Sequence, residues 1–331
     1  MRLMMGVLAG AGIAARLDGD ASLRRRPMRR VTDPLASMGA EIILAGGGVA
    51  PVEIRARDGL DAIEFALPVP SAQVKSAILL AGLRARGRTT VREPHPSRDH
   101  TERMLPAFGV TLHRDGTSIG VDGGQFLRPA HIHVPGDASS AAYWIAAATL
   151  LDGSEVTIKN MSLNPTRLGF VRALNAMGAE IDVTIDDAIA EPLGTVRVRS
   201  APLRGIDLEA ADVPAIVDEL PLFAIVAALA RGRTVVRGAR ELRVKESDRI
   251  ATLASNCAAI GIAIETFDDG FALAGPQTFA GGRVASAGDH RIAMSFAIAA
   301  LAATGESTIE DDECVAVSYP TFFDTLDALA R

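Results

Sequence analysis

A short pattern recurs four times in this chain: the end of a predicted helix, a glycine, and the start of a predicted strand. Each of these glycines lies between two apolar residues; they are Gly39, Gly109, Gly178 and Gly261. A glycine just beyond a helix commonly adopts the left-handed conformation that ends the helix. The copies lie roughly 70 residues or more apart, which is too long for a solenoid repeat, so each is predicted to be a complete α/β unit.

A second pattern also occurs four times: a helix rich in Ala and Leu, a glycine turn, and a strand rich in β-branched residues. The helices are predicted over 76–85, 141–151, 221–230 and 291–303, with turns at Gly87, Gly153, Gly232 and Gly305. Helices that are apolar on all sides are buried. With 48% hydrophobic but only 4% aromatic residues, the core is predicted to consist of small aliphatic side chains. These observations predict an α/β fold, and 331 residues suggest two domains.

The starts of these apolar helices are polar. They lie at 70–73, 135–140, 218–221 and 288–291. Helix capping accounts for Ser71, Asp137 and Asp289, but it does not account for Gln73 or Arg291. Several buried helices that point their N-termini at one place would form an anion pocket from backbone dipoles.

The most cationic stretch is 240–249, which follows a predicted strand at 234–236. Lys245 and Arg249 are four residues apart and would share one face of a helix. Like charges at that spacing and cations in a first turn are both unfavourable, unless an anion lies between them. Glu246 adds a carboxylate that can move a proton. The alternative is a solvated, salt-bridged helix start.

The overall charge of −6 argues against a general nucleic-acid binder. Cys257 and Cys314 are far apart and do not have the spacing of metal ligands, and two cysteines in a chain of this length predict a reducing, cytoplasmic location.

No stretch reaches the ~18 consecutive apolar residues of a membrane span. Residues 1–10 have some features of a short signal peptide; we favour a helix whose front has been cut away.

Three further stretches have both a structural and a functional interpretation. The pair His131 and His133 could bind a metal, but strand alternation explains it and no third ligand is evident. The basic cluster 24–30 is interpreted as a loop that offers one or two arginines to a small anionic substrate. In 97–102, Arg98 either belongs to a capped helix start or points to the same site.

Seven motifs occur in an order that closely resembles the 3-phosphoshikimate 1-carboxyvinyltransferase (5-enolpyruvylshikimate-3-phosphate synthase) family, in its bacterial class II branch. They are Arg25-Arg26-Pro27, Ser71-Ala72-Gln73, Pro135-Gly136-Asp137, Asn164-Pro165-Thr166-Arg167, Asp218-Glu219, Arg243-Val244-Lys245-Glu246-Ser247-Asp248-Arg249 and Asp289-His290-Arg291. The resemblance implies an inside-out α/β barrel in two domains, with repeated βαβαββ units around buried helices. It places the first domain, incomplete at its start, at 1–133, the second at 134–331, and the active-site cleft between them.

The resemblance also implies the reaction: the enolpyruvyl group of phosphoenolpyruvate is transferred to the 5-hydroxyl of shikimate 3-phosphate, and phosphate is released. By motif, the catalytic residues are Asp218, Lys245 and Glu246. The implied phosphoenolpyruvate ligands are Arg26, Gln73, Arg249 and Arg291. The implied shikimate 3-phosphate ligands are Ser71, Ala72, Gln73, Asp218 and Lys245, with Arg98 as a weaker candidate. No metal, cofactor, nucleic acid or membrane is implied, and the full-length family protein is expected to be a monomer.

One departure from the family is large, because the Lys-Ser…Arg signature with which the family chain begins is absent. We therefore expect the 331-residue polypeptide to be inactive and poorly stable, with proteolysis attacking the region before Val134 first. Two other functions stay open. One is a UDP-N-acetylglucosamine 1-carboxyvinyltransferase, although residues 17–27 lack the cysteine of that family. The other is a non-catalytic anion-binding fragment.

Overall fold

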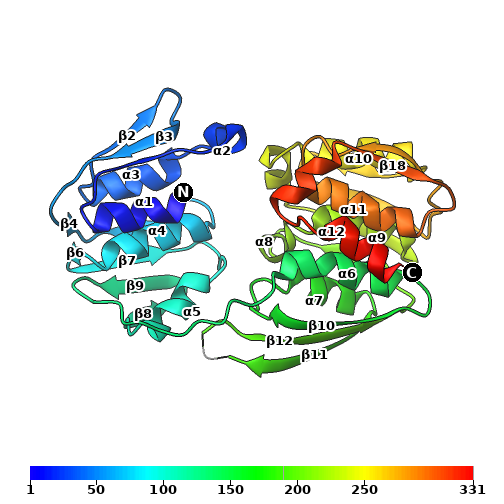
Figure 1. The fold of residues 1–331 in the computed structure, drawn as a ribbon, viewed down its shortest axis with the longest axis horizontal. Coiled ribbons are helices and arrows are strands. Elements are labelled where there is room, and N and C mark those ends of the chain that lie inside the picture. The colour runs from blue at the N-terminus through cyan, green and yellow to red at the C-terminus, as the bar shows by residue number, and fades with distance from the viewer. Residues whose placement is uncertain (189, 331) are drawn as a thin grey trace. The chain divides into compact units, whose positions relative to one another are not determined.

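The computed structural model describes residues 1–188 and 190–330, and the chain forms two compact units, Met1–His133 and Val134–Arg331 (Figure 1). Each unit has a hydrophobic core of its own. Among the helices of the described residues, none combines the length and the apolar character that crossing a membrane requires.

One complete βαβαββ repeat lies in the first unit. It consists of β5 (Glu64–Ala66), α4 (Ala72–Gly82), β7 (Arg88–Arg92), α5 (His100–Ala107), β8 (Leu112–Asp115) and β9 (Ser118–Asp122). Its sheet has the order β5-β7-β9-β8; β5 and β7 are parallel, and β9 is antiparallel to both of its neighbours. The short strands β4 (Leu60–Asp61) and β6 (Ala85–Arg86) form a separate parallel pair.

The rest of the first unit is α1 (Arg2–Gly10), β1 (Ala15–Leu17), α2 (Ala21–Arg25), α3 (Arg29–Ser37), β2 (Ile42–Ala45) and β3 (Val49–Ile54). Its three strands form an antiparallel sheet of order β1-β3-β2. Helices α1, α3 and α4 pack on one another (Figure 1). The backbones of α1 and α4 approach closely, since a Cβ added at Gly6 would lie 2.1 Å from the carbonyl oxygen of Ala77, and one at Gly10 would lie 3.0 Å from the Cα of Ala81.

The second unit contains the same repeat with the same connectivity. Its elements are β13 (Asp207–Leu208), α9 (Leu220–Leu229), β14 (Gly232–Val236), α10 (Arg249–Ala259), β15 (Glu265–Phe267) and β16 (Gly270–Gly275), and the sheet order is β13-β14-β16-β15. The parallel pair β13–β14 and the antiparallel pairs of β16 match β5–β7 and β9 of the first unit. The predicted α/β fold with repeated βαβαββ units is therefore confirmed.

Two more groups of elements complete the second unit. The first is α6 (Ala138–Leu150), β10 (Glu155–Ser162), α7 (Gly169–Ala176), β11 (Glu180–Asp187) and β12 (Leu193–Arg199), with an antiparallel sheet of order β10-β12-β11. The second is β17 (Gly282–Ala285), α11 (His290–Leu301) and β18 (Ser307–Glu310), whose strands are parallel. The short helices are α8 (Val213–Ile216), α12 (Phe322–Leu329) and the 3₁₀ helices η1 (Arg240–Val244) and η2 (Asp312–Val317).

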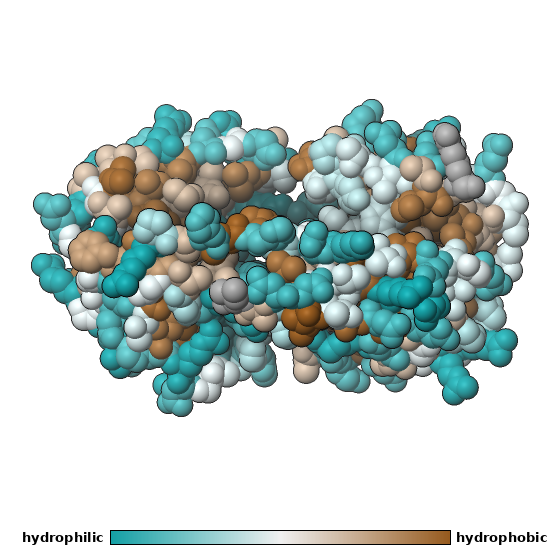
Figure 2. Space-filling model, turned by 60° about the horizontal axis from the view of Figure 1, so that its bottom comes forward, coloured by the Kyte–Doolittle hydropathy of each residue, from teal (hydrophilic) through white to brown (hydrophobic). Residues whose placement is uncertain are grey.

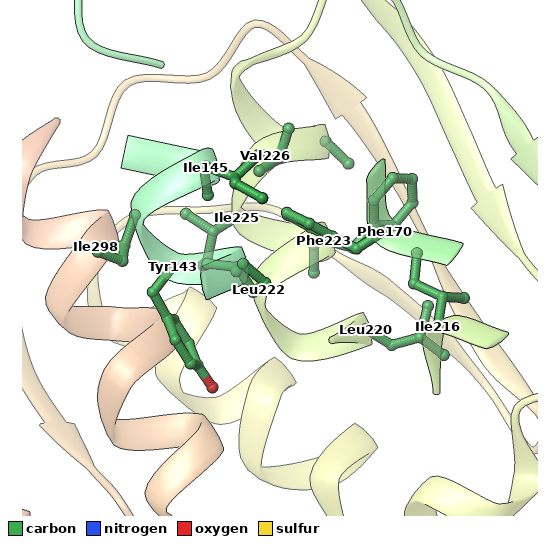
Figure 3. Packing of buried hydrophobic residues seen from close by; sticks show 14 of the residues in the cluster. Tyr143, Ile145, Phe170, Ile216, Leu220, Leu222, Phe223, Ile225, Val226 and Ile298 are labelled. Carbon is green, nitrogen blue, oxygen red and sulfur yellow. The ribbon is translucent and has the colours of Figure 1, made fainter. Parts of the chain in front are cut away.

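Helices α6, α9 and α11 pack together in the core of the second unit (Figure 3). Tyr143 and Ile145 from α6 lie among Leu222, Ile225 and Val226 of α9 in this packing. Every residue of α9 from Leu220 to Ala228 is buried, which confirms the prediction of helices that are apolar on all sides. Because such helices are enclosed along their length, their first turns are the places where polar side chains can gather.

The left-handed conformation predicted for the four repeat glycines is confirmed, with φ between 82° and 99°. The turn glycines Gly87, Gly153 and Gly232 also have positive φ, whereas Gly305 is not among the positive-φ glycines. The chain at His131 and His133 is not in a strand, so strand alternation was the wrong explanation for this pair.

The surface carries apolar side chains as well as polar ones. On the face drawn in Figure 2, hydrophilic side chains separate several hydrophobic groups. Exposed apolar residues in the first unit include Leu3, Met4 and Val7 on α1, with exposed fractions of 38%, 46% and 38%. The opposite side of this helix carries the buried Met5 and Ala9.

Candidate active site

The carboxylate of Asp218 lies at the centre of a cationic cluster in the second unit. Its Oδ1 is 3.6 Å from Lys245 Nζ and 3.7 Å from Arg249 Nη1. Its Oδ2 is 3.9 Å from Arg167 Nη1 and 4.0 Å from Arg291 Nη2. These four cations come from three separate stretches of the chain, so the fold brings together residues that the sequence spreads over 125 positions (167 to 291). Four positive groups around one acid form a site for an anionic ligand.

Arg249 begins α10 and is 1% exposed. Its Nε and Nη2 donate to the two oxygens of Asp289 at 2.8 and 3.2 Å, and Nη2 also donates to Glu246 Oε2 at 2.8 Å. The third nitrogen, Nη1, is buried without a hydrogen-bond partner within the described residues. A buried N–H donor that lacks a partner is costly, and it faces Asp218, so this nitrogen is available to an oxygen of a ligand.

Arg291 lies in the first turn of α11, behind the N-cap Asp289, whose Oδ1 accepts from the Arg291 backbone N–H at 3.0 Å. Its Nη1 donates to the Asp218 carbonyl at 3.2 Å and to Glu219 Oε1 at 3.4 Å. Burial opposes the charged form of Arg291, but Asp218 and Glu219 outweigh it and keep the pKa of this guanidinium above its ordinary value. Arg291 is therefore a permanent cation in a first turn.

Two carboxyl groups next to this cluster have opposite pKa shifts. Burial raises the pKa of Glu219, although Arg291 partly offsets the effect. Asp289 is also buried, but its hydrogen bond with Arg249 outweighs burial and lowers its pKa. The surroundings of Glu219 therefore oppose its ionisation, whereas those of Asp289 favour its anionic form.

The stretch 240–249 differs from its prediction. Asp248 caps α10 by accepting from the Ala251 N–H, and the helix begins only at Arg249. Lys245 follows the 3₁₀ helix η1 instead and pairs with Glu241 at 2.9 Å. Lys245 and Arg249 thus do not share a helix face, yet both reach Asp218, so the tertiary fold brings the two cations to the same carboxylate.

Three candidate residues of the first unit, Ser71, Ala72 and Gln73, lie at the start of α4. Ser71 is at the N-cap position without a capping hydrogen bond from its side chain, which corrects its predicted role, and Ala72 and Gln73 begin the helix. Gln73 Oε1 accepts from Arg2 Nη1 at 2.7 Å, while Arg2 Nη2 donates to the Pro27 carbonyl at 3.1 Å. Because Pro27 follows Arg26, the C-cap residue of α2, Arg2 ties the arginine loop to Gln73.

A buried ion cluster binds both ends of the segment that carries Arg98 to Lys75 of α4. Lys75, in the first turns of α4, is 2.7 Å from Glu93 and 2.6 Å from Glu102, and all three side chains are at most 5% exposed. Glu93 also accepts from Ser97 Oγ. The segment that carries Arg98 therefore starts and ends at carboxylates bound to Lys75, close to Ser71 and Gln73.

Among the cluster residues that were not assigned a role from the sequence are Arg2, Lys75, Arg167 and Glu219. Arg167 and Glu219 stand within motifs that were quoted there, so the motif itself was the signal. Lys75 was detectable as the one charged residue in an apolar helix. Arg2 had no signal in the sequence alone. In the described residues, no group of three or more His, Cys, Asp and Glu side chains is placed to hold a metal ion.

Repeated βαβαββ units, buried helices with cationic first turns, and carboxylates among those cations define a class of transferase that acts on small anionic substrates. The sequence profile of the EPSP synthase (3-phosphoshikimate 1-carboxyvinyltransferase) family matches residues 1–326. This chain belongs to that family. EPSP synthases transfer the enolpyruvyl group of phosphoenolpyruvate to shikimate 3-phosphate in aromatic amino acid biosynthesis.

Individual relatives agree with this assignment. A 3-phosphoshikimate 1-carboxyvinyltransferase of Alkalilimnicola ehrlichii is 50% identical over 323 residues, which cover 97% of this chain and 72% of the relative. One of Bacillus licheniformis is 47% identical over 334 residues, covering 100% and 78%. The structure of EPSP synthase from Acinetobacter baumannii superposes with a TM-score of 0.90 at 43% identity, covering 99% of this chain and 76% of that one. The enolpyruvyl transferase NikO of Streptomyces tendae, at 21% identity and a TM-score of 0.79 over 98% and 74%, shares the fold.

Proposed function

We propose that this protein transfers the enolpyruvyl group of phosphoenolpyruvate to the 5-hydroxyl of shikimate 3-phosphate. The observation that carries the proposal is Asp218, an acid surrounded by Lys245, Arg249, Arg167 and Arg291 at 3.6 to 4.0 Å. Each substrate carries a phosphate and a carboxylate, so a site for both needs several cations around one base. Family membership supplies the identity of the two substrates.

In the proposed mechanism, Asp218 takes the proton of the 5-hydroxyl, and the resulting oxygen forms a bond to C2 of phosphoenolpyruvate. Glu246 delivers a proton to C3, which gives a tetrahedral intermediate. The bond between C2 and the phosphate oxygen then breaks, phosphate leaves with the proton that Asp218 took from the hydroxyl, and Glu246 recovers a proton from C3 to restore the double bond. Lys245, 3.6 Å from Asp218, stabilises the negative charge that develops on the hydroxyl oxygen.

The remaining candidates are proposed as substrate ligands. We assign Arg249 and Arg291 to phosphoenolpyruvate on the family resemblance of their motifs, and their positions 3.7 and 4.0 Å from Asp218 support the assignment. Arg26 and Gln73 complete this set. We assign Ser71, Ala72 and Gln73 at the start of α4 to shikimate 3-phosphate, together with Asp218, Lys245 and Arg98, since a helix N-terminus favours a phosphate group.

Two further proposals concern the cellular location of the protein and its oligomeric state. We place the protein in the cytoplasm, because both Cys257 and Cys314 are free thiols. We propose that it acts as a monomer, which analytical ultracentrifugation tests directly.

The function is tested by incubating the purified protein with phosphoenolpyruvate and either shikimate 3-phosphate or UDP-N-acetylglucosamine. We expect phosphate release and a new enolpyruvyl ether only with shikimate 3-phosphate, detected by ³¹P and ¹H NMR. Product formation only with the UDP-sugar would replace the proposed acceptor. If neither acceptor reacts while calorimetry shows phosphoenolpyruvate binding, the protein is a non-catalytic anion binder and the proposal is wrong.

A further inference from the structure

We propose that Glu219 is a positioning residue: its buried carboxylate holds Arg291 directly and Arg167 through Ser139, so that both guanidinium groups face Asp218. The inference rests on the proposed function and adds a residue to it. Arg291 Nη1 donates to Glu219 Oε1 at 3.4 Å. Ser139 Oγ donates to the same oxygen and accepts from Arg167 Nη2 at 2.6 Å.

The two guanidinium groups that Glu219 holds both approach the same atom, Asp218 Oδ2. Arg291 Nη2 and Arg167 Nη1 are 4.0 and 3.9 Å from Asp218 Oδ2. Glu219 thus connects the two guanidinium groups through hydrogen bonds, and its neighbour in the chain, Asp218, contacts the other nitrogen of each guanidinium. A displaced guanidinium would lose its orientation toward the reacting atoms, which is costly in a transition state.

Helix capping does not explain Glu219. It occupies the N-cap position of α9, but its side chain makes no capping hydrogen bond and is 5% exposed. It turns instead to the first turns of α6 and α11, where Ser139 and Arg291 lie. Burying a carboxylate is costly unless it is hydrogen-bonded. Here the carboxylate is hydrogen-bonded to Ser139 and Arg291, which lie in the first turns of two neighbouring helices, α6 and α11.

The test is a double-mutant cycle between positions 219 and 291, read out as KM for phosphoenolpyruvate and as kcat. We expect Glu219→Ala to raise KM for phosphoenolpyruvate about tenfold, within the coupling range of residues in contact. Glu219→Gln, which keeps an acceptor oxygen, should raise it less. In an Arg291→Ala background, Glu219→Ala should raise KM by a smaller factor than in wild type, because only the indirect effect on Arg167 through Ser139 remains. Effects that multiply independently would overturn the proposal.

Asn256→Ala is the matched control. Asn256 is a buried polar residue of the same unit, 4% exposed, and its amide binds the backbone of Ala285 in β17. Its amide hydrogen bonds within the described residues go to Ala285 and to none of the four cations. Its loss should lower stability and leave KM unchanged, so an equal KM change in Asn256→Ala and Glu219→Ala would assign Glu219 a structural role only. If Glu219→Ala does not fold, the cycle is run with Glu219→Gln.

A second readout does not need turnover. In NMR spectra of arginine side chains, a guanidinium held by hydrogen bonds rotates slowly and gives resolved signals, and the Arg291 signals are identified by their absence in Arg291→Ala. We expect these signals to broaden or shift in Glu219→Ala and to persist in Asn256→Ala. Unchanged Arg291 signals in Glu219→Ala would refute the positioning role even if the protein proved to have no synthase activity.

Discussion

Arg249 and Asp289 form a bidentate ion pair in which neither side chain is exposed to solvent by more than 1%. The pair joins the first residue of α10 to the N-cap of α11, so it fixes two helix starts relative to each other. Buried ion pairs of this geometry are costly to break, because the remaining charge stays buried without a partner. The pair therefore has measurable consequences for stability.

Asp289→Asn should destabilise the protein by about 3 kcal/mol at neutral pH, since it removes the fully buried, bidentate counter-charge of Arg249. The pKa of Asp289 is lowered in the folded protein, so its contribution is present above the unfolded-state pKa of about 3.9 and is lost as the pH falls. The difference between wild type and variant should thus shrink at acidic pH. Urea unfolding across the pH range measures it, and a constant difference would contradict the prediction.

Glu219→Gln should show the opposite pH dependence. The pKa of Glu219 is raised in the folded protein, so its contribution to stability is fully present below the unfolded-state pKa of about 4.3 and is lost as the pH rises through the folded pKa. Wild type should therefore lose stability relative to Glu219→Gln as the pH increases. The same unfolding series measures this; Glu265→Gln, at an exposed surface pair with Arg233, is the control expected to stay flat.

Glu246→Gln should lower kcat by ~10²–10⁴-fold while shikimate 3-phosphate still binds, because the variant cannot exchange a proton at C3. Gln keeps an oxygen that can accept from Arg249, which donates to Glu246 at 2.8 Å, so the geometry should survive. Steady-state kinetics and calorimetry separate the two effects. An unchanged kcat would remove Glu246 from the mechanism.

Arg291→Ala should weaken phosphoenolpyruvate binding more than shikimate 3-phosphate binding, because it removes a permanent cation that capping does not require. Titration calorimetry with each substrate provides the comparison. Arg283→Ala, which removes an exposed arginine paired with Glu310, should affect neither. Equal weakening for both substrates would contradict the assignment.

Gly6→Ala should destabilise the first unit by ~1–3 kcal/mol, the usual cost of overpacking. The new Cβ would lie 2.1 Å from the Ala77 carbonyl oxygen, and neither backbone can yield easily. Gly46→Ala is the control, because a Cβ there meets nothing within 4 Å. Chemical denaturation of the two variants measures the difference, and equal stabilities would show that the helices separate at little cost.

Some parts of the fold are readable from local sequence because their causes are local. The left-handed glycines at 39, 109, 178 and 261 are examples, since a helix end next to a strand start needs a residue that tolerates positive φ. The apolar run of α9 likewise predicts a buried helix, because no face of it carries polar side chains. The start of α10 was misjudged, because charge spacing suggested a helix through Lys245 whereas the cap at Asp248 sets its first residue.

The candidate site was predictable only where a motif named its residues. Asp218, Lys245, Arg249 and Arg291 were named in this way, and the structure brings all four together. The roles of Glu219 and Lys75 were not, because a buried charge is defined by its partners. Ser139, the partner of Glu219, lies 80 positions away, and only the packing of α6 on α9 brings it near.

The close approach of α1 and α4 has an effect beyond stability. Arg2 lies on α1 eight residues before Gly10, which corresponds to roughly 12 Å along a helix. Because backbone meets backbone at Gly6 and Gly10, the contact sets how far α1 can slide along α4, and so it sets the depth at which the Arg2 guanidinium meets Gln73. The two glycines thereby fix the position of α1 along α4. A larger side chain at Gly10 would displace the Arg2 guanidinium, although the two residues are not in contact.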